Sequence, residues 1–360
     1  MIMILQKLRC LSVQCFGCAL LVSLVSSPPA TAGEPQRSVL IVTSTNGTSG
    51  NDVLVFKLAT AGTPSLSLLN VLHTGGKGGA STNAGSVQFH EDLGAVANHD
   101  SSTVTQLARV DDSIVVQGTI NLVSGCANPD SVALSEGRLF IVGATCAESH
   151  LWPSGSAIGS VVPLTDRSAA QIVVGKSWGA VTFASGAVLQ LSLGGDRALD
   201  GVSTAVTLPS DADNTPLGAG FWGDVLGFTP AHSPDSFAIV NKGGEVFPIT
   251  GPTPPYPTNA PCWVAKGPGN VWYTGNAPGD AISIFFSDAQ GGTFYKSVPL
   301  PGSPTDITVS ADRKWLAVIY TAGGAAHVAT FAIDQYGDLS PVATSNSIGV
   351  AAFNGVAISQ

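Results

Sequence analysis

Residues 129–142 read Pro-Asp-Ser-Val-Ala-Leu-Ser-Glu-Gly-Arg-Leu-Phe-Ile-Val, two short apolar runs joined by a Glu136-Gly137 turn. This pattern predicts a tight antiparallel hairpin. The pattern returns farther along the chain, where residues 304–310 and 314–320 flank a turn around Asp312. Weaker copies lie at 86–98 and 261–274. A hairpin that recurs along a chain is typical of a repeat architecture.

Each hairpin is followed by a loop rich in Gly, Asn and Ser and then by further apolar or alternating runs, such as 52–56 and 67–72. Four antiparallel strands per unit make a propeller blade. First strands are expected near residues 86, 131, 171, 222, 263 and 306. Dividing residues 33–360 among seven blades gives about 47 residues per blade, close to the usual period.

The two ends of the chain complement each other. The run Val39–Val42 corresponds to a second strand with no usable first strand before it, whereas Asn354–Ser359 aligns with the first strand Asp130–Ser135. The sequence therefore predicts an all-β, seven-bladed β-propeller, closed by a C-terminal strand that completes blade one and hides a sheet edge. A sandwich of similar strands is the alternative, but it does not explain the displaced terminal strand.

The composition agrees with a turn-rich β protein. Charged residues make up 11% of the 360 residues, compared with about 25% in an average soluble protein. Gly (42) and Pro (23) are frequent, and the hydrophobic fraction of 44% excludes a wholly disordered chain. Long charged helices are not expected.

Residues 1–32 have the pattern of a secretory signal peptide, with Lys7 and Arg9 before an apolar run and Ala30-Thr31-Ala32 as the cleavage site. We expect residues 33–360 to form a single domain that is secreted or periplasmic after cleavage near Ala32. Cleavage would change the formal net charge from −9 to −11. Such a charge argues against nucleic acid as a partner, and no later run is long enough for a membrane span. A monomer with a small-molecule or glycan ligand is expected.

Three cysteines remain after such cleavage, namely Cys126, Cys146 and Cys262. If Glu136 and Gly137 form the hairpin turn, the strand register places Cys126 nearly opposite Cys146. An exported protein favours disulfides, so we predict a Cys126–Cys146 bond and a free Cys262. No neighbouring His or Arg would activate Cys262, which favours a buried, inert thiol over a nucleophile.

Several motifs resemble those of the lactonase-like seven-bladed propellers, which are related to phosphogluconolactonase and the carboxymuconate cycloisomerases. The motifs are Ala260-Pro261-Cys262-Trp263-Val264, Tyr273-Thr274-Gly275-Asn276, Ser303-Pro304-Thr305-Asp306-Ile307 and Asn354-Gly355-Val356-Ala357. The resemblance implies the propeller fold and hydrolysis or isomerisation of a small lactone. The sequence departs from the family because it lacks a Pro-Arg-His strand, and only Phe89-His90-Glu91-Asp92 is similar to the family's Phe-His-Pro turn.

Opening a lactone requires a polarised carbonyl and a base for water. In a propeller such groups gather where the first strands begin, around the axis. Asp130, Asp306 and the loop residue His99 are the candidate catalytic residues. The candidate ligand-binding residues are Asn46, Asn98, Cys262, Trp263, Asn276 and Asn354. The alternative is structural, because Asn and Asp commonly stabilise turns.

Neither a metal-binding motif nor a cofactor motif is present in the sequence, so no cofactor is expected, with a calcium ion in the central channel as the alternative. Arg138 and Arg313 fall at predicted hairpin turns, so few arginines are expected at the axis. Two functions remain open: a weak lactonase-like hydrolase or cycloisomerase, and a non-catalytic propeller that binds a small molecule, glycan or protein.

Overall fold

The structure is a computed structural model that describes residues 37–81, 84–209, 215–232, 236–250, 260–288, 290–349 and 353–360. Residues 37–360 form one compact unit. The predicted signal peptide, its three cysteines and the proline-rich stretch 252–257 lie outside the described residues.

The described chain is built almost entirely of antiparallel strands, in the sheet orders β28-β1-β2-β3, β4 to β7, β16 to β19, β20 to β23 and β24 to β27. Strands β8 to β11 and β12 to β15 form two further groups of four, joined into one eight-stranded sheet by a single parallel bridge from Ser160 to Asp200. The strands of the first half are β1 (Val39–Ser44), β2 (Asp52–Ala59), β3 (Ser65–His73), β4 (Val87–His90), β5 (Leu93–Asn98), β6 (Thr103–Val110), β7 (Ser113–Asn121), β8 (Pro129–Ser135), β9 (Arg138–Gly143), β10 (Cys146–Leu151), β11 (Ala157–Pro163), β12 (Ala169–Val174), β13 (Trp178–Phe183), β14 (Ala187–Leu193) and β15 (Leu199–Ala205). Those of the second half are β16 (Pro216–Trp222), β17 (Val225–Pro230), β18 (Ser236–Val240), β19 (Val246–Thr250), β20 (Pro261–Lys266), β21 (Val271–Asn276), β22 (Ala281–Asp288), β23 (Gly291–Pro299), β24 (Ser303–Val309), β25 (Trp315–Ala322), β26 (Ala325–Ile333), β27 (Leu339–Thr344) and β28 (Asn354–Ser359).

The recurring hairpins have the predicted register. In the β8–β9 hairpin Ser131 pairs with Val142 and Ser135 pairs with Arg138, across the Glu136-Gly137 turn. One first strand differs from the prediction: the strand expected to begin near residue 222 is β16, which ends at Trp222. The chain runs Leu217-Gly218-Ala219-Gly220 through this strand, and the small residues concealed the apolar pattern.

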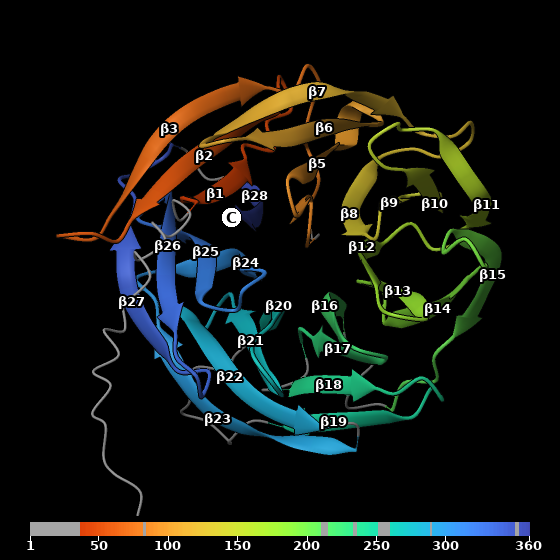
Figure 1. The fold of residues 1–360 in the computed structure, drawn as a ribbon. Helices are drawn as coiled ribbons and strands as arrows, with labels where there is room; N and C mark the ends of the chain where they lie inside the picture. The colour runs from red at the N-terminus through yellow and green to blue at the C-terminus, as the bar shows by residue number, and fades with distance from the viewer. Residues whose placement is uncertain are drawn as a thin grey trace, which may run out of the picture. The chain divides into compact units, whose positions relative to one another are not determined.

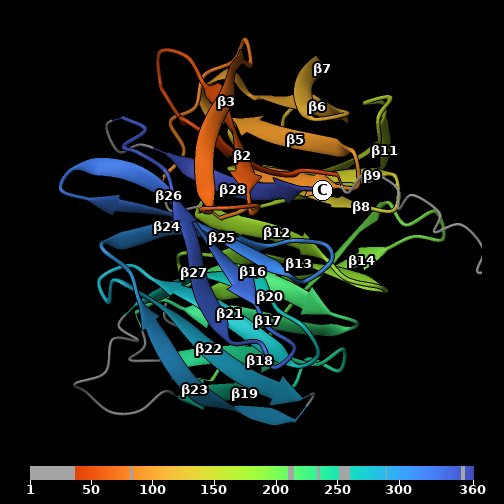
Figure 2. The same ribbon diagram turned by 60° about the vertical axis from the view of Figure 1, so that its left-hand side comes forward.

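The sheets surround a central axis, with the first strand of each group innermost and the fourth on the rim (Figure 1). In the view turned by 60°, β3 and β7 lie at one edge of the sheets and β19 and β23 lie at the opposite edge (Figure 2). Strand β28 pairs antiparallel with β1, placing Ile358 opposite Ile41 and Ala357 opposite Val42. All six residues of β28 are buried. The two ends of the described unit therefore share one sheet.

Gly355 allows β28 to approach β4. Its φ is +76°, and a Cβ atom would lie 2.3 Å from Ser86 Oγ and 2.6 Å from the Val87 backbone nitrogen. Arg109, buried on β6, joins the same region: its guanidinium donates to the carbonyls of Ser359 and Ser38, each at 2.7 Å. A hydrogen-bonded side chain thus holds the C-terminal strand beside the segment that leads into β1.

The hydrophobic core is divided among the interfaces between neighbouring groups of strands. One cluster contains Phe140 of β9 and Ile172 of β12, and another contains Phe237 of β18 and Trp272 of β21. A further cluster joins Ile319 of β25 to Ile41 and Ile358. Buried apolar side chains therefore also connect the β24–β27 sheet to the β28-β1-β2-β3 sheet, which holds both ends of the described unit. Such contacts between neighbouring units are typical of a repeat architecture.

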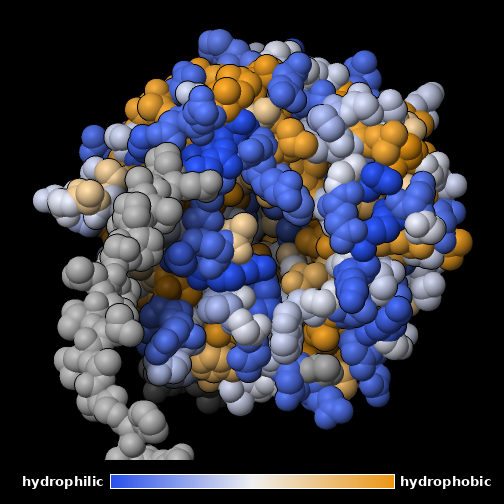
Figure 3. All heavy atoms as spheres, viewed as in Figure 1, coloured by the Kyte–Doolittle hydropathy of each residue, from blue (hydrophilic) through white to orange (hydrophobic). Residues whose placement is uncertain are grey.

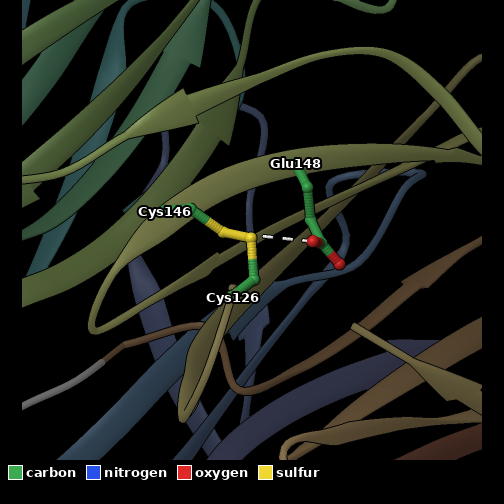
Figure 4. A group of neighbouring side chains, drawn as sticks. All are labelled: Cys126, Cys146 and Glu148. Atoms are coloured by element: carbon green, nitrogen blue, oxygen red, sulfur yellow. Dashed lines mark hydrogen bonds between the residues drawn. A yellow bond between two sulfur atoms is a disulfide. The ribbon is translucent and has the colours of Figure 1, made fainter. Parts of the chain in front are cut away.

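The predicted disulfide is present. Cys126 and Cys146 are bonded, with their Cα atoms 5.4 Å apart, and the carboxylate of Glu148 lies beside them (Figure 4). Cys262 is free and buried, as predicted. Burial raises the pKa of its thiol to about 11, which makes it a poor nucleophile at neutral pH. Among the described residues we find no helix with the length and apolarity needed to cross a membrane.

Candidate functional site

His99 lies in a short 3-10 turn, His99–Ser101, between β5 and β6. The turn is fastened to the start of β8 by Asn128, whose backbone N–H donates to Ser102 Oγ at 3.1 Å and whose side-chain amide donates to the His99 carbonyl at 3.3 Å. Asn128 is in the left-handed region, with φ +52°, so the chain bends there before it enters β8 at Pro129. This bend brings Asp130 toward His99.

The imidazole of His99 lies between two carboxylates. Its Nδ1 is 2.8 Å from Asp100 Oδ1, and its Nε2 is 3.6 Å from Asp130 Oδ1. The side chains of His99 and Asp130 are 22% and 9% exposed. Burial raises the pKa of Asp130 to about 7, with the His99 charge acting in the opposite direction. A buried carboxyl group with a raised pKa beside an imidazole nitrogen is the geometry of a candidate acid–base pair.

A glycine-rich loop positions Asp100. The Asp100 backbone N–H donates to the carbonyls of Lys77 and Gly78, at 3.2 and 3.0 Å. A Cβ atom on Gly79, whose φ is +104°, would lie 2.6 Å from Asp100 Oδ2. Glycine is therefore required where the loop meets the carboxylate. With its proton on Nδ1, His99 donates a hydrogen bond to Asp100 Oδ1, and Nε2 then faces Asp130 as an acceptor. The sequence places Asp100 directly after His99, but it gives no sign of the glycine-rich loop that positions this carboxylate.

The candidate asparagines form bonds inside the protein. Asn46 holds the glycine-rich loop, because its Oδ1 accepts from Gly79 and Ala80, at 2.8 and 3.0 Å. Asn98 is fully buried and donates to Thr105 Oγ1 at 2.8 Å. Asn276 is also fully buried and donates to Ser283 Oγ at 2.7 Å. Both residues end strands, β5 and β21. These hydrogen bonds give the Asn46, Asn98 and Asn276 side chains a structural role.

Asp306 and Asn354 lie at the seam between β24 and β28. Asp306 accepts from the backbone N–H groups of Ile307 and Val356, at 2.8 and 3.1 Å. Burial raises its pKa to about 7, although these donors favour the charged form. Asn354 begins β28, and its carbonyl accepts from Ser44 Oγ at 2.7 Å. Asp306 is thus a link between inner strands, and no contact joins it to His99 or Asp130 among the described residues.

Cys262 and Trp263 begin β20 as predicted, but they pack into apolar clusters. Trp263 is half-buried against the Ile307 and Leu316 cluster. In the described residues, one group of three potential metal ligands occurs, Cys126, Cys146 and Glu148. Because its two sulfurs are joined in a disulfide, they are not thiolate ligands. The channel calcium alternative stays a prediction.

The inner strands enclose a cavity of about 240 Å³. Figure 3 shows one face of the molecule, which is hollowed near its middle and surrounded largely by hydrophilic residues. The cavity is lined mainly by the middle and later residues of the inner strands, toward the hairpin turns. Its lining extends to Gly85, Gln171 and Asp306 but does not include His99 or Asp130. Arg313, from the turn after β24, lines this cavity although few arginines were expected at the axis. Arg313 lies at a hairpin turn, as predicted. Because this turn is beside the axis, the long arginine side chain reaches the cavity.

No family model and no curated protein matches the sequence. Solved structures do resemble the fold. A Lactobacillus plantarum protein gives a TM-score of 0.64 at 16% identity, covering 91% of this chain and 100% of that one. A Bacteroides fragilis protein provisionally assigned as a 6-phosphogluconolactonase gives 0.61 at 13% identity, covering 90% and 99%. The virginiamycin B lyase of Staphylococcus aureus gives 0.58 at 17% identity, covering 77% and 89%.

These similarities concern the fold alone. The described residues form an all-β, propeller-like fold that is similar to those of the lactonase-like propellers, as the sequence motifs predicted. The sequence identities are low, and a similar fold at this level of identity does not show that two proteins have the same activity. Any function must be argued from the His99–Asp130 geometry.

Proposed function

We propose that the chain is an exported, seven-bladed propeller in which β28 completes the first blade. The support is that the described strands fall into seven groups of four and that β28 pairs with β1. In addition, an apolar cluster joins each group to the next around the ring. Export rests on the signal-like residues 1–32. The protein should be recovered outside the cytoplasm with an N-terminal sequence that begins at Gly33. Recovery only from the cytoplasm would contradict export, and retention of Met1 would contradict cleavage.

We further propose that His99 and Asp130 carry out general acid–base hydrolysis of a small lactone, in a monomer that needs no cofactor. The observation that carries this proposal is the 3.6 Å approach of His99 Nε2 to a largely buried Asp130 carboxyl group with a pKa of about 7. Both protonation states of such a carboxyl are populated at neutral pH, which is the requirement for an efficient proton donor.

The reaction follows from this arrangement. His99 Nε2 accepts a proton from water as the water oxygen attacks the lactone carbonyl carbon. The ring C–O bond then breaks, and the leaving oxygen takes the proton of Asp130. The protonated imidazole returns its proton to the Asp130 carboxylate, so that one water is consumed and one hydroxy acid is released. Asp100 holds the imidazole orientation throughout.

The proposed turnover is slow. The carbonyl oxygen develops negative charge, and loss of one preorganised donor to such an oxygen costs roughly 100- to 1,000-fold in rate. No arginine side chain forms an ion pair or hydrogen bond with His99, Asp100 or Asp130 among the described residues. The proposed hydrolase therefore relies on water or backbone donors for this charge.

The test is a hydrolysis screen with gluconolactone, phosphogluconolactone and muconolactone. We expect measurable turnover of one lactone, reduced by about 100-fold in His99→Gln, in line with the usual contribution of a general base. His73→Gln is the matched control, because His73 Nδ1 lies 2.7 Å from Asp52 Oδ1 in a similar pair on the outer strand β3. Equal turnover in all three proteins would contradict a role for His99.

A non-catalytic binding propeller is the second candidate. It is favoured by the internal bonding of Asn46, Asn98 and Asn276, which leaves few of the predicted polar side chains for chemistry. The same screen distinguishes the two functions. Saturable binding of a lactone without turnover, unaffected by His99→Gln, would support the binding protein and exclude the hydrolase.

A further inference from the structure

Two cations lie at the hairpin-turn end of the central cavity. Lys266 ends β20, and Arg313 follows β24; both line the cavity of about 240 Å³. Arg313 also lines an adjoining cavity of about 410 Å³, together with His90, Glu91 and Gln360. Lys266 and Arg313 lie where inner strands end, whereas Asp130 lies near the start of the inner strand β8. The two cations are therefore separate from the proposed acid–base site.

Lys266 is buried, and its ammonium group is satisfied by backbone carbonyls rather than by a carboxylate. Its Nζ donates to Gly267, Gly269 and Val271, at 2.8, 2.6 and 3.1 Å. The same Nζ lies 5.4 Å from the ring centre of Trp222 and 5.2 Å from that of Trp272. Burial and the nearby Arg313 lower the pKa of Lys266 to about 8. The ammonium is therefore a fixed positive charge without a counter-ion at neutral pH.

Arg313 is accessible and mostly unbonded. One N–H of its guanidinium donates to the Lys266 carbonyl, and the described residues provide it with no other hydrogen bond and no ion pair. A guanidinium carries five N–H donors, so four remain for a ligand. By contrast, the neighbouring Lys314 pairs with Asp312 at 3.5 Å. The remaining N–H donors of the Arg313 guanidinium are thus available to a ligand at the wall of the cavity.

Negative groups near this end do not neutralise the pair. Asp306 lines the same cavity but forms no ion pair with Lys266 or Arg313 among the described residues. Burial raises the pKa of its carboxyl group to about 7, which reduces its negative charge at neutral pH. Glu91 and the C-terminal residue Gln360 line the adjoining cavity, and neither forms an ion pair with Arg313. Two positive charges without counter-ions in a concave site attract anions even when the net charge of the protein is negative. The reason is that a small ligand in the site interacts mainly with the local electrostatic potential.

We propose that the hairpin-turn end of the channel binds a small anion, with Arg313 gripping its carboxylate or phosphate group and Lys266 supplying a second positive charge. Arginine is suited to this task because its planar donors match two oxygens of a carboxylate or phosphate. Gln88 and Thr308 line both cavities beside Arg313 and offer hydrogen bonds to the rest of the ligand.

The test is calorimetric titration of the full-length mature protein with inorganic phosphate and, separately, with succinate, at low ionic strength and pH 7. The two arms distinguish a phosphate site from a carboxylate site. We expect saturable binding of at least one anion, weakened about tenfold or more in Arg313→Gln, since charge-assisted hydrogen bonds are the strong ones. Lys314→Gln removes one charge from the same turn and should change the affinity by less than about twofold, because exposed pairs contribute little.

A second measurement does not depend on a variant. The wild-type protein is modified with phenylglyoxal, with and without the anion, and the labelled arginines are mapped by mass spectrometry. Arg313 should be protected, whereas Arg138, at the corresponding turn of the β8–β9 hairpin, should not. Absence of saturable binding by both anions, equal affinity in Arg313→Gln, or equal labelling of Arg313 with and without anion would each overturn the proposal. Because the two sites are at opposite ends, His99→Gln should bind the anion as the wild type does.

Discussion

Removal of the Cys126–Cys146 disulfide should lower stability by an amount that follows from its loop length. The two cysteines are separated by 20 residues. In the chain-entropy model, releasing a loop of this size lowers the free energy of unfolding by about 3 kcal/mol at 25 °C. We therefore expect the double variant Cys126→Ser/Cys146→Ser to remain folded but to be less stable by about this amount.

The local contacts explain why the native fold should survive. Glu148 Oε2 accepts from the Val123 backbone at 2.9 Å, and Glu148 Oε1 lies 2.8 Å from His150 Nε2. These contacts tie the segment before Cys126 to β10 without the sulfur bond. The main effect of the double variant is then on the entropy of the unfolded chain.

The corresponding melting shift is small but measurable. Unfolding entropy near 60 °C is about 2.1 cal/mol/K per residue, so residues 37–360 give roughly 0.7 kcal/mol/K, and 3 kcal/mol corresponds to about 4 °C. Calorimetry of the wild type, the double variant and both proteins under a phosphine reductant measures this shift. The reductant should lower the melting temperature of the wild type and leave the double variant unchanged. A double variant within about 1 °C of the untreated wild type would refute the reasoning.

Two other perturbations test the seam and the buried carboxyls. Deletion of residues 354–360 removes the buried side chains of Val356 and Ile358, each of which stabilises the fold by about 1.5–3 kcal/mol, and exposes the edge of β1. We therefore expect insoluble or protease-sensitive protein, with deletion of Gln360 alone as the control. An unchanged melting temperature for the longer deletion would contradict ring closure. Asp130 and Asp306 have folded-state pKa values near 7, above the ordinary value of 3.8, so the folded state binds more protons and stability should fall as pH rises from about 4 to 7. Denaturant titrations across this range measure the slope, which Asp306→Asn should reduce; a stability that rises over the same range would contradict the burial of these groups.

The local pattern of the sequence determined the strands and their hairpins. Alternating apolar residues around Gly and Asp turns specify period-two strands with short connections, and the Ser131–Val142 register followed directly from the Glu136-Gly137 turn. The same register located the disulfide. The pairing of Asn354–Ser359 with β1 was also readable, because a displaced repeat leaves one strand too few at one end of the chain and one too many at the other.

Only the tertiary structure decided which polar residues are available. Asn98 and Asn276 look like loop residues in the sequence, yet they are buried and bonded within neighbouring strands. Asp100 became part of the candidate site because a glycine-rich loop 20 residues earlier packs against it, and Arg313 reached the cavity because its turn lies beside the axis. Sequence periodicity sets which face of a strand is apolar, whereas the proximity of polar groups depends on how strands from distant repeats are arranged around the ring.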